Sequence, residues 1–331
     1  MPAYAVARFR LVLCNCCYKL VRFNSTELDL KYKTFFFSFL CGGKNKFEKF
    51  KNMIEINKNY NESNLETMAK TPDNFIDLTV TSPPYDDLRI YNGYSFDFES
   101  TAKELYRVTK DGGVVVWVIG DSTIKGSESG TSFRQALFFM SVGFNLHDTM
   151  IYAKNNVYAH DPRNKRYKQC FEYMFVFSKG KPNTYNEIKD RPNKHAGKIL
   201  RGTAGRTKDG IKRELKPMVI GDFQARFNIW EYTTGGNVSR DKIAFKHPAI
   251  FPEKLVEDHI ISWSNEGDLV YDPFMGSGTT AKMSILNNRN WIGSEISSEY
   301  CNIIEERIKK AWEEKRKEKD LTQKTLFGDG M

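Results

Sequence analysis

Residues 269–281 read LVYDPFMGSGTTA, and this stretch decides the fold of the chain. An apolar strand, predicted over residues 269–274, runs into a glycine turn and then into a helix predicted over residues 279–287. Gly276 and Gly278, followed by Ala281, satisfy the pattern G-x-G-x-x-G/A. Glycine allows a tight turn and lets the backbone approach a ligand that a Cβ atom would obstruct. The stretch therefore predicts a cofactor site at the end of a parallel strand.

A second strand, predicted over Trp291–Ile296, carries Glu295 at its end, 19 residues after Gly276. A carboxylate there can accept hydrogen bonds from both hydroxyls of an adenosine ribose. This arrangement suits a nicotinamide dinucleotide and S-adenosylmethionine equally, because both contain adenosine. The absence of lysine after the glycines argues against a triphosphate loop. Asp272 would repel a pyrophosphate and attract a cationic ligand such as a sulfonium amino acid, which favours S-adenosylmethionine.

The run Thr81-Ser82-Pro83-Pro84-Tyr85 follows a buried strand predicted over residues 75–81. Ligands in open α/β sheets bind beyond the carboxyl ends of the strands, so this run is expected in the active crevice. The two prolines fix φ and lack N–H groups, giving a stiff turn with fixed oxygen acceptors. Such acceptors suit an exocyclic amine, and Tyr85 offers a flat face for an unstacked base. The competing interpretation is a structural proline turn beside a packed tyrosine.

Strands and helices alternate along the chain from residue 53, which predicts an α/β fold with a doubly wound, mostly parallel, Rossmann-like sheet. Other strands are expected at 53–57, 114–120, 146–153 and 173–178, with a Gly112–Gly113 turn before the second of these. Other helices are expected at 64–70, 100–109, 131–142, 253–262 and 299–320. The predicted organisation comprises an N-terminal appendage or upstream extension of the reading frame (1–52), a catalytic half (53–178), a loop-rich insertion (179–228), a cofactor-binding half (229–310), and a charged helix and tail (311–331).

The chain has 331 residues and a net charge of +9, and 40% of its residues are hydrophobic, as in ordinary globular proteins. Residues 179–217 hold 12 Lys/Arg against 4 Asp/Glu, a local excess of +8 that suits a phosphate backbone or, equally, a solvated basic loop. No apolar stretch is long enough to span a membrane. Cys14 and Cys17 form a C-x-x-C without a nearby histidine. We therefore expect no metal site and a reduced, cytoplasmic protein.

Three motifs together resemble the amino-group DNA methyltransferases of bacteria and phages. VTSPPY (80–85) matches the pattern typical of the N4-cytosine enzymes, and DPFMGSGTT (272–280) resembles the S-adenosylmethionine loop. HPAIFPEKL (247–255) is similar to the segment that lines the methionine end of the cofactor pocket. The catalytic motif precedes the basic insertion and the cofactor motifs, which is the circularly permuted order of the β group. The resemblance covers residues 53–310.

The resemblance implies a site-specific transferase that moves a methyl group from S-adenosylmethionine to a flipped base. Ser82 and the Pro83 carbonyl would hold the amino group in the turn stiffened by Pro84, and Tyr85 would stack on the base. The implied cofactor residues are His247, Pro248, Asp272, Pro273, Phe274, Gly276, Gly278, Thr279 and Glu295. Residues 179–228 would be the target-recognition lobe, with Arg201, Arg206, Lys208, Lys212 and Arg213 as candidate DNA contacts. Candidate partners are double-stranded DNA, a cognate restriction endonuclease and a second copy of the chain.

The stretch Asn61–Glu66 departs from the family pattern. Ser63 stands where an aspartate near the adenosine is expected, and Glu62 is the candidate substitute. The catalytic run contains no cysteine, which argues for direct in-line transfer without a covalent enzyme intermediate. Serine in the catalytic run favours cytosine N4, with adenine N6 as the alternative. An NAD-linked oxidoreductase and a non-catalytic DNA-binding protein are the alternatives from other classes.

Overall fold

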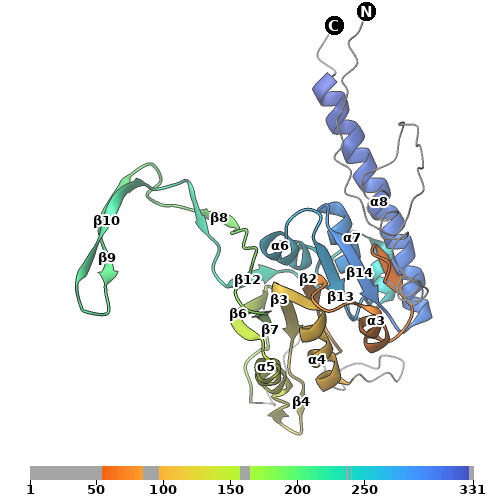
Figure 1. The fold of residues 1–331 in the computed structure, drawn as a ribbon. Helices are drawn as coiled ribbons and strands as arrows, with labels where there is room; N and C mark the ends of the chain where they lie inside the picture. Colours follow the sequence, from red (N-terminus) through yellow and green to blue (C-terminus); the bar gives the residue numbers. More distant parts are fainter. Residues whose placement is uncertain (1–53, 85–96, 157–164, 236–237, 240, 328–331) are drawn as a thin grey trace, which may run out of the picture. The chain divides into compact units, whose positions relative to one another are not determined.

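The computed structural model describes residues 54–84, 97–156, 165–235, 238–239 and 241–327. Within these residues, eight strands form one large sheet in the order β1-β14-β13-β2-β3-β7-β6-β12 (Figure 1). All run in the same direction except β7, which is antiparallel to both of its neighbours. The strands are β1 (Lys58–Tyr60), β2 (Ile76–Thr81), β3 (Thr109–Ile119), β6 (Asn145–Lys154), β7 (Phe171–Ser178), β12 (Ile229–Tyr232), β13 (Leu269–Asp272) and β14 (Asn290–Ser294). The sequence-based expectation of an α/β fold with a mostly parallel sheet is confirmed.

Helices cover both faces of this sheet (Figure 1). They are α3 (Asn64–Lys70), α4 (Phe98–Val108), α5 (Thr131–Val142), α6 (Glu253–Trp263), α7 (Thr279–Leu286) and α8 (Ser298–Phe327), with a short 3-10 helix η2 (Lys242–Lys246) before α6. The single helix α8 crosses the predicted boundary between residues 310 and 311. Among the described residues, no helix has both the length and the apolar character that a membrane crossing requires.

Strand β3 shows why the sheet needs helices on both sides. Val115, Trp117 and Ile119 pack into a core with residues of α4 and α5. Val114, Val116 and Val118 point the other way and pack with residues of α6. Successive side chains of a strand point to opposite faces, so a continuous apolar strand requires cover on both. The VVVWVI run therefore lies at the centre of the fold.

Short elements differ from the sequence-based expectations. The described part of the strand predicted at 53–57, residues 54–57, is not a strand, and Asn57 adopts a left-handed conformation (φ 59°) that interrupts extended backbone. The first strand is β1 instead, which pairs in parallel with β14. The predicted Gly112–Gly113 turn lies inside β3, where a register irregularity against β2 accommodates the positive φ of Gly112.

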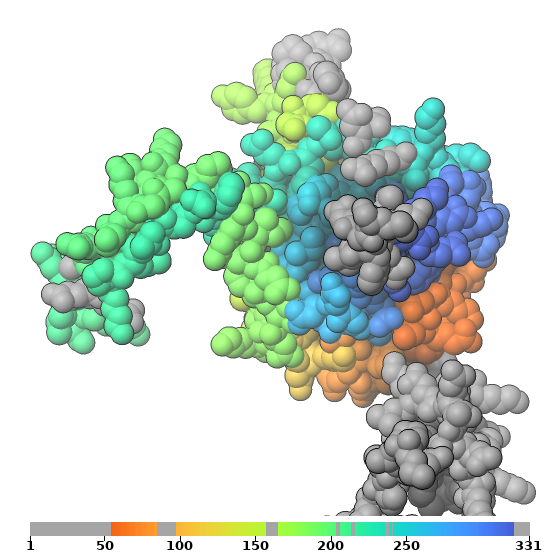
Figure 2. All heavy atoms as spheres, turned by 90° about the horizontal axis from the view of Figure 1, so that it is seen from above, coloured from red at the N-terminus to blue at the C-terminus, as the bar shows by residue number. Residues whose placement is uncertain are grey.

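The segment 179–228 contains more regular structure than the loop-rich prediction allowed. Two antiparallel pairs form within it, β8 (Lys189–Pro192) with β11 (Phe223–Ala225) and β9 (Ile199–Arg206) with β10 (Lys212–Val219). The described side chains of β9 and β10 are exposed (Figure 2). The backbone N–H and C=O groups of β9 and β10 form hydrogen bonds with one another across the hairpin. The pair therefore forms without packing against the main core.

Strands β2, β13 and β14 are neighbours in the sheet and parallel, so their carboxyl ends meet at one edge. Residues 58–70, coloured orange, lie against the blue segments of β14 and α8 in both views (Figures 1 and 2). The backbone agrees, because Glu295 N–H donates to Tyr60 O at 3.0 Å. The fold thereby brings residues near 60, 82, 272 and 295 to the same edge of the sheet.

Candidate active site

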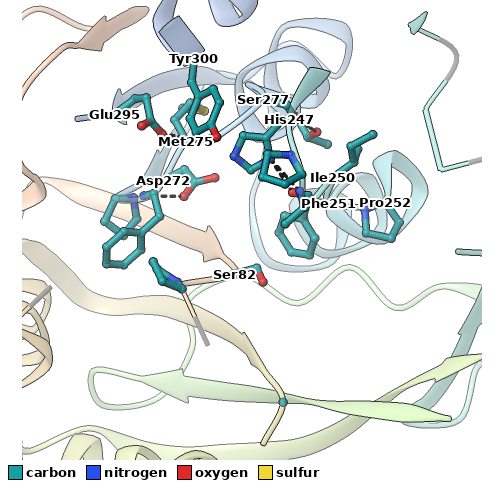
Figure 3. Close-up of a pocket in the computed structure, with 18 of the residues that line it drawn as sticks. Ser82, His247, Ile250, Phe251, Pro252, Asp272, Met275, Ser277, Glu295 and Tyr300 are labelled. Carbon is teal, nitrogen blue, oxygen red and sulfur yellow. Dashed lines mark hydrogen bonds between the residues drawn. The ribbon is translucent and has the colours of Figure 1, made fainter. Parts of the chain in front are cut away.

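A cavity of about 1010 Å³ lies at this edge of the sheet. Its wall includes Ser82 and Pro84 after β2, Asp272 at the end of β13, and Glu295 after β14. Figure 3 shows Ser82 facing the wall that carries Asp272, Glu295 and His247. A pocket of this size suits a cofactor together with part of a second substrate. The catalytic and cofactor motifs predicted from the sequence therefore open onto one cavity.

The glycine loop between β13 and α7 has a conformation that depends on its two glycines. Gly276 and Gly278 have φ values of 53° and 80°, in the left-handed region that other residues avoid. A Cβ at Gly276 would lie 3.2 Å from the His247 ring, and one at Gly278 would lie 3.2 Å from Ile304. A side chain at either position would therefore be strained and would require these neighbours to shift.

Glu295 is a buried carboxylate, 9% exposed, that holds the glycine loop from the neighbouring strand. Its Oε2 accepts the Gly276 N–H at 2.8 Å, and its Oε1 accepts the Ser297 N–H at 2.9 Å. Burial raises the pKa of this carboxyl above its usual range. Each carboxylate oxygen retains a lone pair for a further donor. The residue therefore fits an adenosine ribose, whose two hydroxyls need acceptors.

Asp272 joins the catalytic strand to the cofactor loop. Its Oδ1 accepts from the Thr81 hydroxyl at 2.6 Å and the Phe274 N–H at 3.0 Å, and its Oδ2 accepts from the Thr280 hydroxyl at 2.7 Å. Burial raises the pKa of Asp272. The predicted contact with a cationic ligand would be additional to these bonds, because each oxygen can accept more than one donor.

The segment after η2 supplies the opposite wall of the cofactor end. His247 and Pro248 line the cavity together with Phe251 and Pro252 (Figure 3). The Ala249 N–H donates to His247 Nδ1 at 3.1 Å, which fixes the ring beside Gly276. Tyr300 of α8 packs edge-on against the same ring, with centroids 4.4 Å apart. Tyr300 also lines the cavity, although no sequence motif indicated it.

The structure places the other predicted site residues as follows. Pro273, Phe274 and Thr279 line the cavity, as Gly276 does. Gly278 does not line the cavity but shapes the glycine loop behind it. Pro83 is buried and does not line the cavity. Tyr85 lies outside the described residues, as do Cys14 and Cys17.

Ser63, which departs from the family pattern, has a structural part at the start of α3. Ser63 caps α3 and accepts the Glu66 N–H, while the Glu66 side chain accepts the Ser63 N–H, which is a capping box. Glu62 lines the cavity and also accepts from the Thr67 hydroxyl at 2.9 Å and from Lys70. Ser63 thus stabilises a helix start, and Glu62 is the carboxylate that this stretch presents to the cavity.

The far wall of the cavity was not predicted from the sequence. It includes Asp121 after β3, Tyr152 and Lys154 at the end of β6, and Glu172 at the start of β7. Lys154 and Glu172 form an ion pair at 2.5 Å. Because ligands in such sheets bind at the carboxyl ends of the strands, residues at the ends of β3 and β6 could have been included among the candidates. The sequence could not show that β7 would insert between them.

The predicted DNA contacts lie on the hairpin and not in the cavity. Arg201 and Arg206 belong to β9, Lys212 and Arg213 to β10, and Lys208 to the turn between them. Arg206 and Lys212 are register partners, and both are exposed. Among the described residues, no three His, Cys, Asp or Glu side chains are arranged to bind a metal ion.

Fold and cavity together define a class: an α/β protein with an adenosine-type cofactor pocket beside a proline-stiffened turn. The family model described as DNA methylase matches residues 76–306. The chain therefore belongs to the amino-methylating (N6/N4) DNA methylase family, whose methyl donor is S-adenosylmethionine. The alternative of an NAD-linked oxidoreductase is wrong.

Relatives agree with this assignment. The chain is 65% identical over 238 residues to the orphan methyltransferase M.BamHII of Bacillus amyloliquefaciens, covering 71% of this chain and 89% of the relative. It is 30% identical over 266 residues to the type II methyltransferase M.MjaI of Methanocaldococcus jannaschii, covering 77% of each. The solved structure of the cytosine-N4-specific PvuII DNA methyltransferase superposes with a TM-score of 0.57 at 21% identity, covering 77% of this chain and 87% of that one. This structural likeness shows a shared fold.

Proposed function

We propose that this protein is a site-specific DNA methyltransferase that modifies the N4 amino group of a cytosine flipped out of duplex DNA. The carrying observation is that Ser82 and Glu295 line one continuous cavity. A cofactor whose ribose is held at Glu295 would lie in the same chamber as the catalytic turn. When bound, S-adenosylmethionine supplies the methyl group.

The residues of the turn would prepare the amino nitrogen. The lone pair of an exocyclic amine is delocalised into the base ring, so the nitrogen is a weak nucleophile. In our proposal the Ser82 hydroxyl accepts one of its hydrogens, and Pro84 keeps the turn rigid. The family motif assigns the other hydrogen to the Pro83 carbonyl, although Pro83 itself does not line the cavity in this structure. Tyr85, carried over from the family motif, would stack on the flipped base, at about 1–3 kcal/mol. Positioning the reactants in line would then supply most of the acceleration.

The cofactor would be bound by residues that are already hydrogen-bonded to one another in this structure. Glu295 would accept the ribose hydroxyls, and the loop from Asp272 to Thr279 would follow the adenosyl group. His247 and Pro248 would line the methionine end, with the Asp272 carboxylate contributing negative charge near the sulfonium. Glycines at 276 and 278 let the loop keep this path, because side chains there would meet His247 and Ile304.

In this proposal residues 179–228 form the target-recognition lobe, inserted between the catalytic and cofactor halves in the permuted order of the β group. The excess of basic residues in 179–217 supports phosphate contacts, and exposed arginines suit guanine edges. Duplex DNA is the proposed partner. A restriction endonuclease and a second copy of the chain stay predictions, and the relative at 65% identity is named an orphan methyltransferase.

The alternative is methylation of adenine N6 by the same geometry. Ser82 supports cytosine, because VTSPPY (80–85) matches the pattern typical of the N4-cytosine enzymes. The test is to methylate DNA with the purified protein and isotope-labelled cofactor, digest the DNA, and identify the nucleoside by mass. Labelled N4-methylcytosine is expected, and labelled N6-methyladenine would contradict the proposed base. Salt-dependent DNA binding without label in either nucleoside would point to a catalytically silent protein.

A further inference from the structure

Four charged side chains form a cluster behind the glycine loop, in which the two cations are buried and the two acids are partly buried. Arg307 of α8 is fully buried, and the side chain of Lys282 of α7 is 3% exposed. Both pair with Asp241, at 3.2 and 2.8 Å, and with Glu253, at 2.7 and 3.0 Å. None of the four residues lines the active-site cavity. The cluster is electrically balanced, so its charges compensate one another away from water.

Arg307 reaches three parts of the chain with one guanidinium group. Its Nη1 donates to Ser277 O at 2.6 Å, to the Ser277 hydroxyl at 3.1 Å and to the Thr279 hydroxyl at 3.0 Å. Its Nη2 donates to Glu253 at 2.7 Å, at the start of α6. Its Nε donates to Asp241 at 3.2 Å, just before η2. The side chain thus connects the glycine loop to both ends of the segment 241–253.

These connections join the two walls of the cofactor end of the cavity. One wall is the glycine loop, in which Ser277 lies between two left-handed glycines. The other is the segment 247–252, which begins after Asp241 and ends before Glu253. Ser239 strengthens the second anchor, because its hydroxyl donates to Glu253 at 2.6 Å. Displacing the cluster would therefore shift both walls without removing a single residue that lines the cavity.

Stability alone does not account for such a cluster. Removing two pairs of charges from water carries a desolvation penalty, and apolar replacements of similar volume are often neutral or stabilising. A planar guanidinium, in contrast, holds several acceptors in a fixed fork, which a lysine ammonium cannot do. The Lys282 ammonium donates to the two acids. The geometry that only arginine supplies is the link to Ser277 and Thr279.

We propose that Arg307 is a positioning residue for methyl transfer: it fixes the glycine loop relative to the segment 247–252, and so sets where the cofactor lies. The proposal rests on the family activity and does not depend on which base is methylated. A shift of about 1 Å at a reacting centre can reduce the rate by two orders of magnitude. Arg307 would act through these two walls, since it does not itself line the cavity.

The test compares Arg307→Lys with Lys315→Met in the full-length protein. Lys315 is a matched control, because it also lies on α8 and donates to an α7 carbonyl, Ile285 O, at 2.6 Å, away from the loop. Calorimetry measures the affinity for S-adenosylmethionine, single-turnover kinetics measure methyl transfer at saturating cofactor, and thermal melts measure stability. For Arg307→Lys we expect weaker cofactor binding and methyl transfer slowed by up to about 100-fold, with DNA affinity unchanged. For Lys315→Met we expect both quantities within about twofold of wild type.

A second variant covers the case in which Arg307→Lys folds poorly. Glu253→Gln keeps an acceptor for Ser239 but removes one charge from the cluster, and it should weaken cofactor binding in the same direction by a smaller factor. The proposal is overturned if folded Arg307→Lys or Glu253→Gln binds the cofactor as wild type does. It is also overturned if Lys315→Met, at an equal decrease in melting temperature, loses as much affinity for S-adenosylmethionine as Arg307→Lys does. A wild-type protein that bound no S-adenosylmethionine would instead refute the assigned cofactor, which is a separate result.

Discussion

Replacing Glu295 by glutamine tests how the cofactor site is built. The carboxylate accepts two backbone N–H groups, one on each oxygen, from Gly276 at 2.8 Å and from Ser297 at 2.9 Å. Glutamine retains one oxygen and places an NH₂ group where the other was. One of the two buried N–H groups would then face a donor and lose its acceptor.

The substitution changes two free energies, that of folding and that of cofactor binding. A buried N–H without an acceptor costs about 1–3 kcal/mol of folding free energy. Loss of the charged acceptor for the ribose hydroxyls removes about 1.5–3 kcal/mol of binding free energy, or roughly 10- to 150-fold in Kd. Glu295→Gln should therefore lower the melting temperature and weaken S-adenosylmethionine binding together. Glu299→Gln, an exposed substitution on the first turn of α8, should change neither.

The pH dependence gives a second measurement on the same residue. Burial raises the pKa of Glu295, and only the ionised form is a full acceptor for both hydroxyls. Cofactor affinity of the wild type should thus decrease as the pH is lowered through this raised pKa, at a higher pH than an ordinary glutamate would require. Calorimetric titrations at several pH values should show a flatter profile for Glu295→Gln. Wild-type affinity in that variant at neutral pH would refute the role of Glu295.

Three further predictions address other parts of the molecule. Ser82→Ala removes one acceptor of the amino group and should slow single-turnover methylation about 10- to 100-fold with unchanged cofactor Kd; a normal rate would show that the hydroxyl has no part in the reaction. Replacing both Arg206 and Lys212 by alanine should weaken DNA binding and reduce the slope of log K against log salt by about 2, with cofactor binding as the control; an unchanged slope would place the phosphate contacts elsewhere. Burial lowers the pKa of His259 to about 3 in the folded protein, whereas in the unfolded chain this histidine has an ordinary pKa of about 6.5. Below pH ~6.5 the unfolded chain therefore binds a proton that the folded protein does not, and the free energy of unfolding decreases as the pH is lowered. Between pH 7 and pH 5, urea unfolding of the wild type should lose about 2 kcal/mol more than that of His259→Phe, and equal losses would mean that His259 is protonated in the fold.

Local signals in the sequence predicted the long elements well. Helix α3 begins and ends where expected because Ser63 and Glu66 form a capping box. Helix α5 lies between Gly130 and Gly143, both with positive φ, and its bounds also match. The VVVWVI run identified β3 because an uninterrupted apolar strand can only be buried on both faces.

Elements that depend on distant partners were missed. Strand β12 has only four residues, with Trp230 and Tyr232 buried between exposed neighbours, and it exists through its parallel pairing with β6. The far wall of the cavity depends on the same neighbourhood, because Lys154 of β6 meets Glu172 of β7 only once those strands pair. Pairing between segments distant in sequence is fixed by the whole sheet, and no local pattern reports it.

Asp272 shows how a residue expected to bind a ligand also organises the site. Its carboxylate is bonded to the hydroxyl of Thr81, the residue directly before Ser82, and to that of Thr280 in the first turn of α7. The start of the catalytic turn and the end of the glycine loop are therefore tied to one buried group. Negative charge near the cofactor and a fixed distance between the two motifs are compatible, because Oδ2 accepts one of the three hydrogen bonds to this carboxylate and can accept a second donor. Any motion of the glycine loop that displaced Asp272 would also move the start of the turn at Ser82. If Ser82 holds the target amine as we propose, binding of the cofactor and alignment of the base are coupled through this carboxylate.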